Sequence, residues 1–127
     1  MKKTLLYFVF LYGFNTLLAQ NFTAGGVNYT VTSATAPFTV KVANNINYTG
    51  ALVVPETVTN EAISYAVTSI ENDAFENCAG LTSVNTGNSV TIIGNYAFGH
   101  CGNLSSVTIG NAVTSIGNYA FQYCIGL

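Results

Sequence analysis

Residues 90–112 read VTIIGNYAFGHCGNLSSVTIGNA, and the blocks on either side repeat this pattern. Residues 67–89 read VTSIENDAFENCAGLTSVNTGNS, and residues 113–127 read VTSIGNYAFQYCIGL. Equivalent positions lie 23 residues apart, with no insertion or deletion between the blocks. The shared columns hold aliphatic residues, phenylalanine, cysteine and leucine: Val67, Val90 and Val113; Ile70, Ile93 and Ile116; Phe75, Phe98 and Phe121; Cys78, Cys101 and Cys124; Leu81, Leu104 and Leu127.

A period of 23 residues falls within the range of leucine-rich repeats. Successive side chains of a strand face opposite sides, so alternation in the segment from 104 to 109 places Val107 and Ile109 inward. Ser106 and Thr108 then point outward. Each coil has one apolar face that it cannot bury alone, and stacking joins these faces into one core. The sequence therefore predicts a mainly β fold, a leucine-rich-repeat solenoid with 23-residue coils.

The pattern resembles the BspA-type leucine-rich repeats of secreted and surface bacterial proteins. The resemblance lies in V-T-S-I-G-x-x-A-F-x-x-C-x-x-L-x-x-V-x-I, which is almost complete in 90–109 and 113–127. It implies a β-rich solenoid displayed outside the cell, and some relatives are described as adhesins for host or matrix proteins. The family offers no shared catalytic residue, so function transfers only as a class.

Residues 1–19 have the layout of a secretory signal peptide, with Lys2 and Lys3 before an apolar run and a small residue, Ala19. The alternative is an uncleaved membrane anchor, for which the run is short. Cleavage after Ala19 predicts a secreted or cell-surface protein without a transmembrane span.

Residues 20–66 differ from the repeats, and we interpret them as an N-terminal β cap that covers one end of the solenoid. Residues 27–31 and 38–42 alternate with period two and are predicted strands. The strand part of a repeat already appears at Leu52, because residues 52–58 keep the apolar columns of 107–113. Thr59 to Ala66 is then an insertion in which a hairpin is expected. Residues 67–127 are the repeats, and the pattern at the last residue suggests a fragment of a longer protein.

Charged residues make up only 6% of the chain, far below the usual quarter of a soluble protein. Three basic residues cannot supply the clustered charge that nucleic-acid binding needs. No charged residue follows Glu76. We expect no cofactor and no enzymatic activity, because the chain lacks a phosphate loop and a paired carboxylate constellation.

The three cysteines keep the repeat spacing, which predicts a buried structural ladder of small side chains. A single disulfide between adjacent coils, or a metal site, remains an alternative, since stacked strands lie within disulfide range. The three phenylalanines of the repeat form a second structural ladder. These two core ladders comprise Cys78, Cys101, Cys124, Phe75, Phe98 and Phe121.

Other side chains suggest chemistry less strongly. His100 adjoins Cys101, but neighbouring side chains usually point apart, so a catalytic pair is not expected. Glu71, Asp73 and Glu76 could bind calcium, but no calcium-binding loop is present, and solvated surface charges are the default interpretation.

The candidate binding face consists of outward polar residues of the strands and tyrosines in exposed columns. Tyrosine is common in recognition surfaces. An extracellular protein or matrix component is the predicted partner, bound through many weak contacts. The alternative function is a spacer or stabilising arm of a larger secreted protein, such as an enzyme. The candidate residues are Ser83, Asn85, Ser106, Thr108, Tyr96, Tyr119 and Tyr123.

Overall fold

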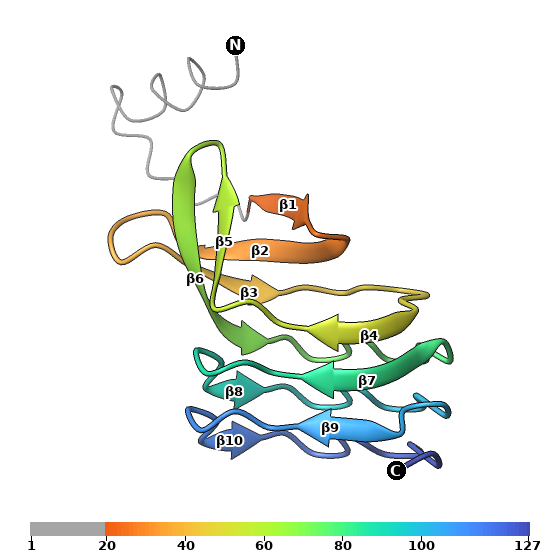
Figure 1. Cartoon of the computed structure of the whole chain (residues 1–127). Coiled ribbons are helices and arrows are strands. Elements are labelled where there is room, and N and C mark those ends of the chain that lie inside the picture. Colours follow the sequence, from red (N-terminus) through yellow and green to blue (C-terminus); the bar gives the residue numbers. More distant parts are fainter. Residues whose placement is uncertain (1–19) are drawn as a thin grey trace.

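The computed structural model describes residues 20–127, and these residues form ten strands in two sheets (Figure 1). The predicted signal peptide, residues 1–19, lies outside the described residues. The strands are β1 (Asn21–Ala24), β2 (Val27–Ser33), β3 (Thr39–Val42), β4 (Gly50–Val53), β5 (Thr57–Asn60), β6 (Ile63–Ile70), β7 (Leu81–Asn85), β8 (Ile92–Ile93), β9 (Ser106–Thr108) and β10 (Ser115–Ile116).

Stacked coils build both sheets, as the repeat period predicts. One sheet has the order β1-β2-β3-β6-β8-β10, with β5 paired to β6, and the other has the order β4-β7-β9. Three successive coils add one strand to each sheet, namely β3 and β4, β6 and β7, and β8 and β9, and β10 extends the larger sheet. The repeats pair in parallel with equivalent residues opposite each other, such as Val84 and Val107. The prediction of a mainly β repeat solenoid is therefore confirmed.

Phenylalanine rings stack through the core between the sheets. The ring centroids of Phe75 and Phe98 are 5.4 Å apart at an interplanar angle of 3°. Phe98 and Phe121 repeat the contact at 5.3 Å and 8°. A buried phenylalanine contributes about 1.5–3 kcal/mol through removal of its surface from water. The period of the sequence thus places like side chains over one another.

The outermost part of the smaller sheet, at β9 and just after it, is less buried than alternation alone predicts. Val84 and Thr86 are fully covered, whereas Val107 is only partly buried and Ile109 is 38% exposed. Within residues 20–127, no further coil lies against the outer side of β9 and β10. Ile109, which was expected to face inward, is therefore not buried. Within residues 20–127 no further coil packs over it as the next coil packs over Thr86.

Residues 20–54 extend the stack with strands that the sequence repeat does not show. The predicted strands at 27–31 and 38–42 are observed as β2 and β3, whereas β1 was not foreseen. β1, β2 and β3 form an antiparallel meander, and β3 pairs in parallel with β6. The cap residues thereby continue the same sheet as the repeats.

A first coil precedes the sequence repeats and runs from β3 through a loop to β4. In its loop Asn45 lies opposite the first repeat and donates its backbone N–H to the carbonyl oxygen of Ala74 at 2.6 Å. Asn45 is 4% exposed, and its amide is satisfied by the Asn28 N–H at 2.8 Å and the Ala43 carbonyl at 2.7 Å. β4 pairs with β7 and places Leu52 opposite Val84, as predicted from the apolar columns.

The insertion after β4 forms the β5–β6 hairpin, which pairs Asn60 with Ile63 at its tip and projects beyond the meander (Figure 1). This confirms the hairpin expected between Thr59 and Ala66. β6 continues through to Ile70, so one strand belongs both to the hairpin and to the first repeat.

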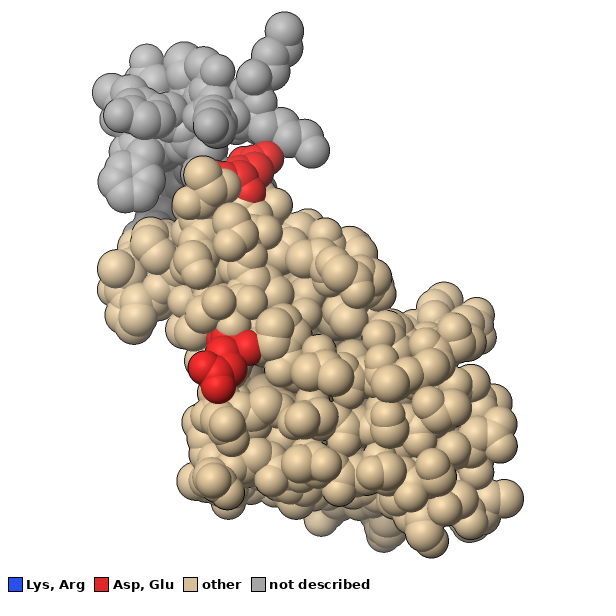
Figure 2. All heavy atoms as spheres, viewed as in Figure 1, with Lys and Arg blue, Asp and Glu red and all other residues tan. Residues whose placement is uncertain are grey.

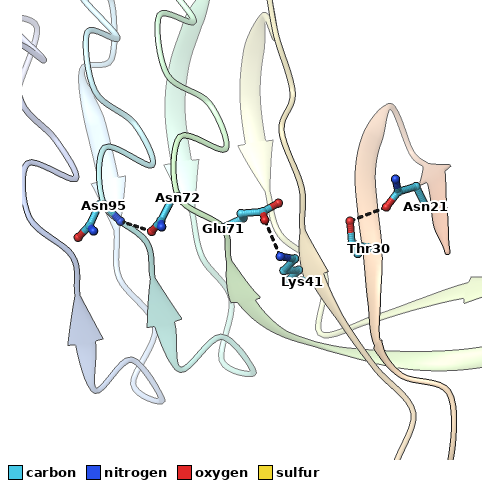
Figure 3. A network of polar contacts seen from close by, with 6 residues as sticks. All are labelled: Asn21, Thr30, Lys41, Glu71, Asn72 and Asn95. Carbon is cyan, nitrogen blue, oxygen red and sulfur yellow. Dashed lines mark hydrogen bonds and ion pairs between the residues drawn. The ribbon is translucent and has the colours of Figure 1, made fainter. Parts of the chain in front are cut away.

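Polar contacts join neighbouring coils along the larger sheet, both between its strands and in the turns that follow them (Figure 3). The Asn72 side chain accepts the backbone N–H of Asn95 at 2.8 Å, and Asn95 accepts that of Asn118 at 2.7 Å. At the junction with the cap, Lys41 on β3 forms an ion pair with Glu71, and both side chains are about one-third exposed. An exposed pair of this kind contributes at most about 1 kcal/mol.

Candidate functional site

The strand face of the smaller sheet carries two rows of outward side chains. Ser83 pairs with Ser106, and Asn85 pairs with Thr108, so each row crosses from β7 to β9. Asn85, Ser106 and Thr108 are exposed, and Ser83 is partly exposed. β7 and β9 contain no charged residue, and Figure 2 shows no charged side chain on the visible surface of the lower coils. This face is therefore polar, uncharged and regular.

Most hydrogen-bonding groups in these rows remain available. Asn85 accepts the backbone N–H of Gly87 at 3.0 Å through its side-chain oxygen. For Ser83, Ser106 and Thr108, residues 20–127 provide no side-chain hydrogen bond. Three hydroxyl groups on adjacent strands can therefore donate to or accept from a bound molecule.

The tyrosine candidates lie in the turn between the two sheets, not on the strand face. Tyr96 and Tyr119 occupy one column, and Tyr123 shares a second column with His100. All four residues have left-handed backbone conformations, with φ between 51° and 60°. This region is uncommon for residues other than glycine, and Asn, Asp and His are the types enriched there. The first repeat, residues 67–89, has Asp73 and Asn77 in the same columns, also with positive φ.

Ring stacking holds the tyrosines in pairs across neighbouring coils. The centroids of Tyr96 and Tyr119 are 5.1 Å apart at an interplanar angle of 28°. His100 and Tyr123 are 4.8 Å apart at 31°. Sequence reasoning treated these side chains singly, although their 23-residue spacing was the signal that they stack. The structure therefore gives one stacked and one tilted ring pair, together with two strand rows. No hydrogen bond or ring contact within residues 20–127 joins the pairs to the rows.

The cysteines form a buried column that accounts for their spacing. Cys78 and Cys101 are fully buried, and Cys124 is 8% exposed. All three are free thiols, and each donates its S–H to a carbonyl oxygen of the preceding coil at 3.1 Å, on Asn45, Phe75 and Phe98 in turn. Of the interpretations that the spacing leaves open, the structure has the ladder of thiols and no bridge among them.

Burial also suppresses the chemistry of these thiols. Desolvation raises the pKa of Cys101 to about 12 and raises the pKa of Cys78 and Cys124 above the ordinary value. A thiolate, not a thiol, is the nucleophile and the metal ligand. His100 does not alter this, because its ring lies on Tyr123 at the surface while the Cys101 sulfur points to Phe75 in the core.

Comparison with protein-family models identifies one match. Residues 55–127 match the family described as BspA type leucine rich repeat region (6 copies). Among curated protein sequences, none matches the chain. Across residues 20–127 no helix has the length and apolarity required to cross a membrane.

Solved structures of bacterial leucine-rich repeat proteins resemble this chain. A protein from Bacteroides capillosus is 27% identical with a TM-score of 0.70, over 80% of this chain and 73% of that one. A leucine rich cell surface protein from Faecalibacterium prausnitzii is 31% identical with a TM-score of 0.71, over 85% and 29%. A protein from Bacteroides ovatus is 29% identical with a TM-score of 0.75, over 84% and 28%. The chain thus spans less than a third of the latter two proteins.

Proposed function

The chain belongs to the BspA-type leucine-rich repeat family, and we propose that it is a non-catalytic binding module that acts in secreted form or on the cell surface. The proposed partner is an extracellular protein or a matrix component. Support for this location comes from the signal-peptide pattern of residues 1–19 and from the similar surface protein of Faecalibacterium prausnitzii.

The observation that carries the proposal is the strand face of β7 and β9. Its two rows place Ser83 beside Ser106 and Asn85 beside Thr108, with hydroxyl groups free for a partner. Stacked repeats create extended surfaces of this kind, and each coil adds a few polar contacts. Without a charged residue on these strands, the face favours an uncharged polar partner surface over one that depends on ion pairs.

The absence of an activated nucleophile on this face supports a binding role. The cysteines, which are the strongest nucleophiles of the chain, lie in the core with raised pKa values. His100 stands outside the strand face, in the turn column with Tyr123.

The test compares charged substitutions on the two sheets. In one variant Ser106 and Thr108 are both replaced by lysine. In the control, lysine replaces Ser115 of β10, on the opposite sheet, and the preceding residue Thr114, whose hydroxyl donates to Thr91. All four residues are exposed. Binding to a panel of purified matrix proteins and to solubilised surface proteins of epithelial cells is measured by surface plasmon resonance, with circular dichroism to verify folding.

We expect the wild-type chain to bind at least one panel member and the Ser106/Thr108 variant to lose at least tenfold in affinity. The control variant should retain affinity within about twofold. The proposal fails if the folded wild-type chain binds no panel member, an outcome that would favour a spacer role, or if both variants bind like the wild type.

A further inference from the structure

β4 leaves one edge of the smaller sheet unpaired. It is an outer strand, since β7 pairs with it on one side and residues 20–127 supply no strand on the other. The N–H groups of Gly50 and Val54 donate to Gly80 and Asn85 of the next coil at 2.8 and 2.9 Å. Alternate residues of a parallel strand bond to opposite sides. The peptide groups of Ala51 and Val53 are therefore directed to the open edge, where the Ala51 carbonyl oxygen accepts a long hydrogen bond from the Tyr48 hydroxyl at 3.4 Å.

The open edge lies in a step between the two sheets (Figure 1). The larger sheet continues past the level of β4 through β3, β2 and β1, whereas the smaller sheet ends at β4. The side of the step is formed by β5, which follows β4 in the chain. A strand added to the open edge of β4 would thus pair with β4 and also pack beside β5.

A hollow of about 230 Å³ occupies this step. None of the residues around it is charged, and most are apolar or aromatic. Val53, whose side chain is 66% exposed, belongs both to the hollow and to the open edge of β4. The lining residues are Ala24, Gly25, Val27, Tyr29, Tyr48, Val53, Pro55, Val58 and Thr59.

Tyr29 adds a polar group to this apolar lining. Its side chain is 1% exposed, and residues 20–127 offer its hydroxyl no hydrogen-bond partner. Within residues 20–127, Ser89 Oγ is the one side-chain oxygen or nitrogen that is both fully buried and unpaired, so the Tyr29 hydroxyl keeps some contact with solvent. Burial raises the pKa of Tyr29 to about 12, and its hydroxyl is protonated at neutral pH, as that of an ordinary tyrosine is.

We propose that β4 is a docking site for an extended peptide segment of a partner protein, which adds to the sheet as a further strand. The segment carries one large aliphatic side chain, which enters the hollow beside Val53, and it is uncharged at that position. Strand addition supplies affinity through main-chain hydrogen bonds, and the pocket selects the side chain. Ala51 and Val53 lie beside Ser83 and Asn85 in the register. The proposed site uses the backbone edge of β4, whereas the proposed binding face uses side chains two strands away on β9, so either proposal can fail without the other.

The probe is an acetylated, amidated peptide of sequence TSTLTST, titrated into the isotopically labelled chain and followed by NMR. We expect the amide signals of Ala51 and Val53 to shift and to exchange more slowly with solvent. Peptides with valine or phenylalanine at the centre should bind within about tenfold of the leucine peptide. Peptides with aspartate or lysine at the centre should bind at least tenfold more weakly than the leucine peptide.

Backbone modification separates strand addition from simple apolar contact. Two versions of the peptide are N-methylated at alternate residues, one at odd and one at even positions, and only one should bind. Val53→Pro removes the N–H that faces the open edge, and proline is tolerated where that group faces solvent. This variant should keep its melting temperature within a few degrees and lose at least tenfold in peptide affinity, whereas Val53→Thr retains binding.

Three results would each overturn the proposal. The first is no shift at Ala51 or Val53 at millimolar peptide. The second is equal binding of the two methylated peptides or of the folded Val53→Pro variant. The third is a concentration-dependent dimer of the chain that protects the Ala51 and Val53 amides, which would make a second copy the occupant of this edge.

Discussion

Cys101 donates its S–H to the carbonyl oxygen of Phe75 in the preceding coil, with 3.1 Å between sulfur and oxygen. Cys124 repeats this contact with Phe98, because the cysteine and phenylalanine columns both have the 23-residue period. Cys78 donates instead to the carbonyl oxygen of Asn45, in the coil that precedes the sequence repeats. The thiol fills a small space beside the stacked rings and satisfies a carbonyl group that faces the core. The column thus contributes packing and a weak hydrogen bond in each coil.

We predict that the cysteines react slowly in the folded chain. Cys78 and Cys101 are fully buried, so an uncharged alkylating reagent such as N-ethylmaleimide should label them only after unfolding. Cys124 is 8% exposed in the last coil and should react first. Mass spectrometry over time measures the order, and denatured protein should accept three labels without a reducing agent. Two labels or fewer under those conditions would contradict the free-thiol column.

Alkaline pH should destabilise the fold. The pKa of Cys101 rises from 9.0 to about 12 on folding, because burial disfavours the thiolate. Below pH 9 the Cys101 thiol is protonated in both the folded and the unfolded state, and its contribution to stability is fully present. Above pH 9 the thiol loses its proton in the unfolded state first, which favours unfolding. The free energy of unfolding should therefore decline between pH 9 and about 12, by up to about 1.4 kcal/mol per pH unit from this group.

Urea unfolding at pH 8, 10 and 11 checks this prediction. Cys101→Ala is the matched variant, since it removes the thiol and should show a shallower decline than the wild type. Tyr29 contributes in the same direction, because burial raises its pKa from 10.0 to about 12. An unfolding free energy that stays constant over this pH range would contradict the assignment.

The repeat half of the fold was predictable because its information is periodic. The 23-residue alignment of the blocks identifies the core columns, and the buried positions of Phe75, Phe98 and Cys101 follow from it directly. The coil from β3 to β4 was only partly predictable, since Asn45 stands in its loop and satisfies its buried amide with backbone groups that only the fold brings near. Its strand β4, which contains Leu52, was predictable because residues 52–58 keep the apolar spacing of the repeats.

The candidate binding residues were harder to foresee than the core. Alternation was sufficient for Ser106 and Thr108, which lie outward on β9. It carried no information on the left-handed backbone of Tyr96, because tyrosine is an unfavourable residue for that conformation. The open edge of β4 was equally hidden, since sheet order depends on which strands of the cap pair and not on any single residue.

Ser89→Ala should stabilise the chain by about 1 kcal/mol. The Ser89 hydroxyl oxygen is buried without a hydrogen-bond partner within residues 20–127, and an unsatisfied buried group costs about 1–3 kcal/mol. The equivalent positions in the flanking blocks, Ala66 and Ala112, already carry alanine. Chemical unfolding measures the gain. Ser105→Ala is the control and should give no gain, since its hydroxyl donates to Thr82 at 3.2 Å; an equal gain in both would refute the explanation.

Gly94→Ala should destabilise the chain, whereas Gly102→Ala should not. A Cβ atom at Gly94 would lie 2.5 Å from the backbone nitrogen of Asn72, so two coils would have to separate. At Gly102 the nearest atom is the Ile125 side chain at 3.9 Å, which is an ordinary contact. In the first repeat the position equivalent to Gly94 is occupied by Glu71. A side chain is accommodated there because the adjacent strand is β3 of the cap, whose Lys41 forms an ion pair with Glu71.

Crowding of this kind typically costs about 1–3 kcal/mol, and we expect the upper part of that range for Gly94→Ala because the contact is with backbone. Gly102→Ala should be neutral or gain about 0.4–1 kcal/mol, since alanine restricts the unfolded chain. Thermal and urea unfolding of both variants measure the difference. If the two substitutions had equal effects, the close approach of the coils at Gly94 would not be the constraint that excludes a side chain there.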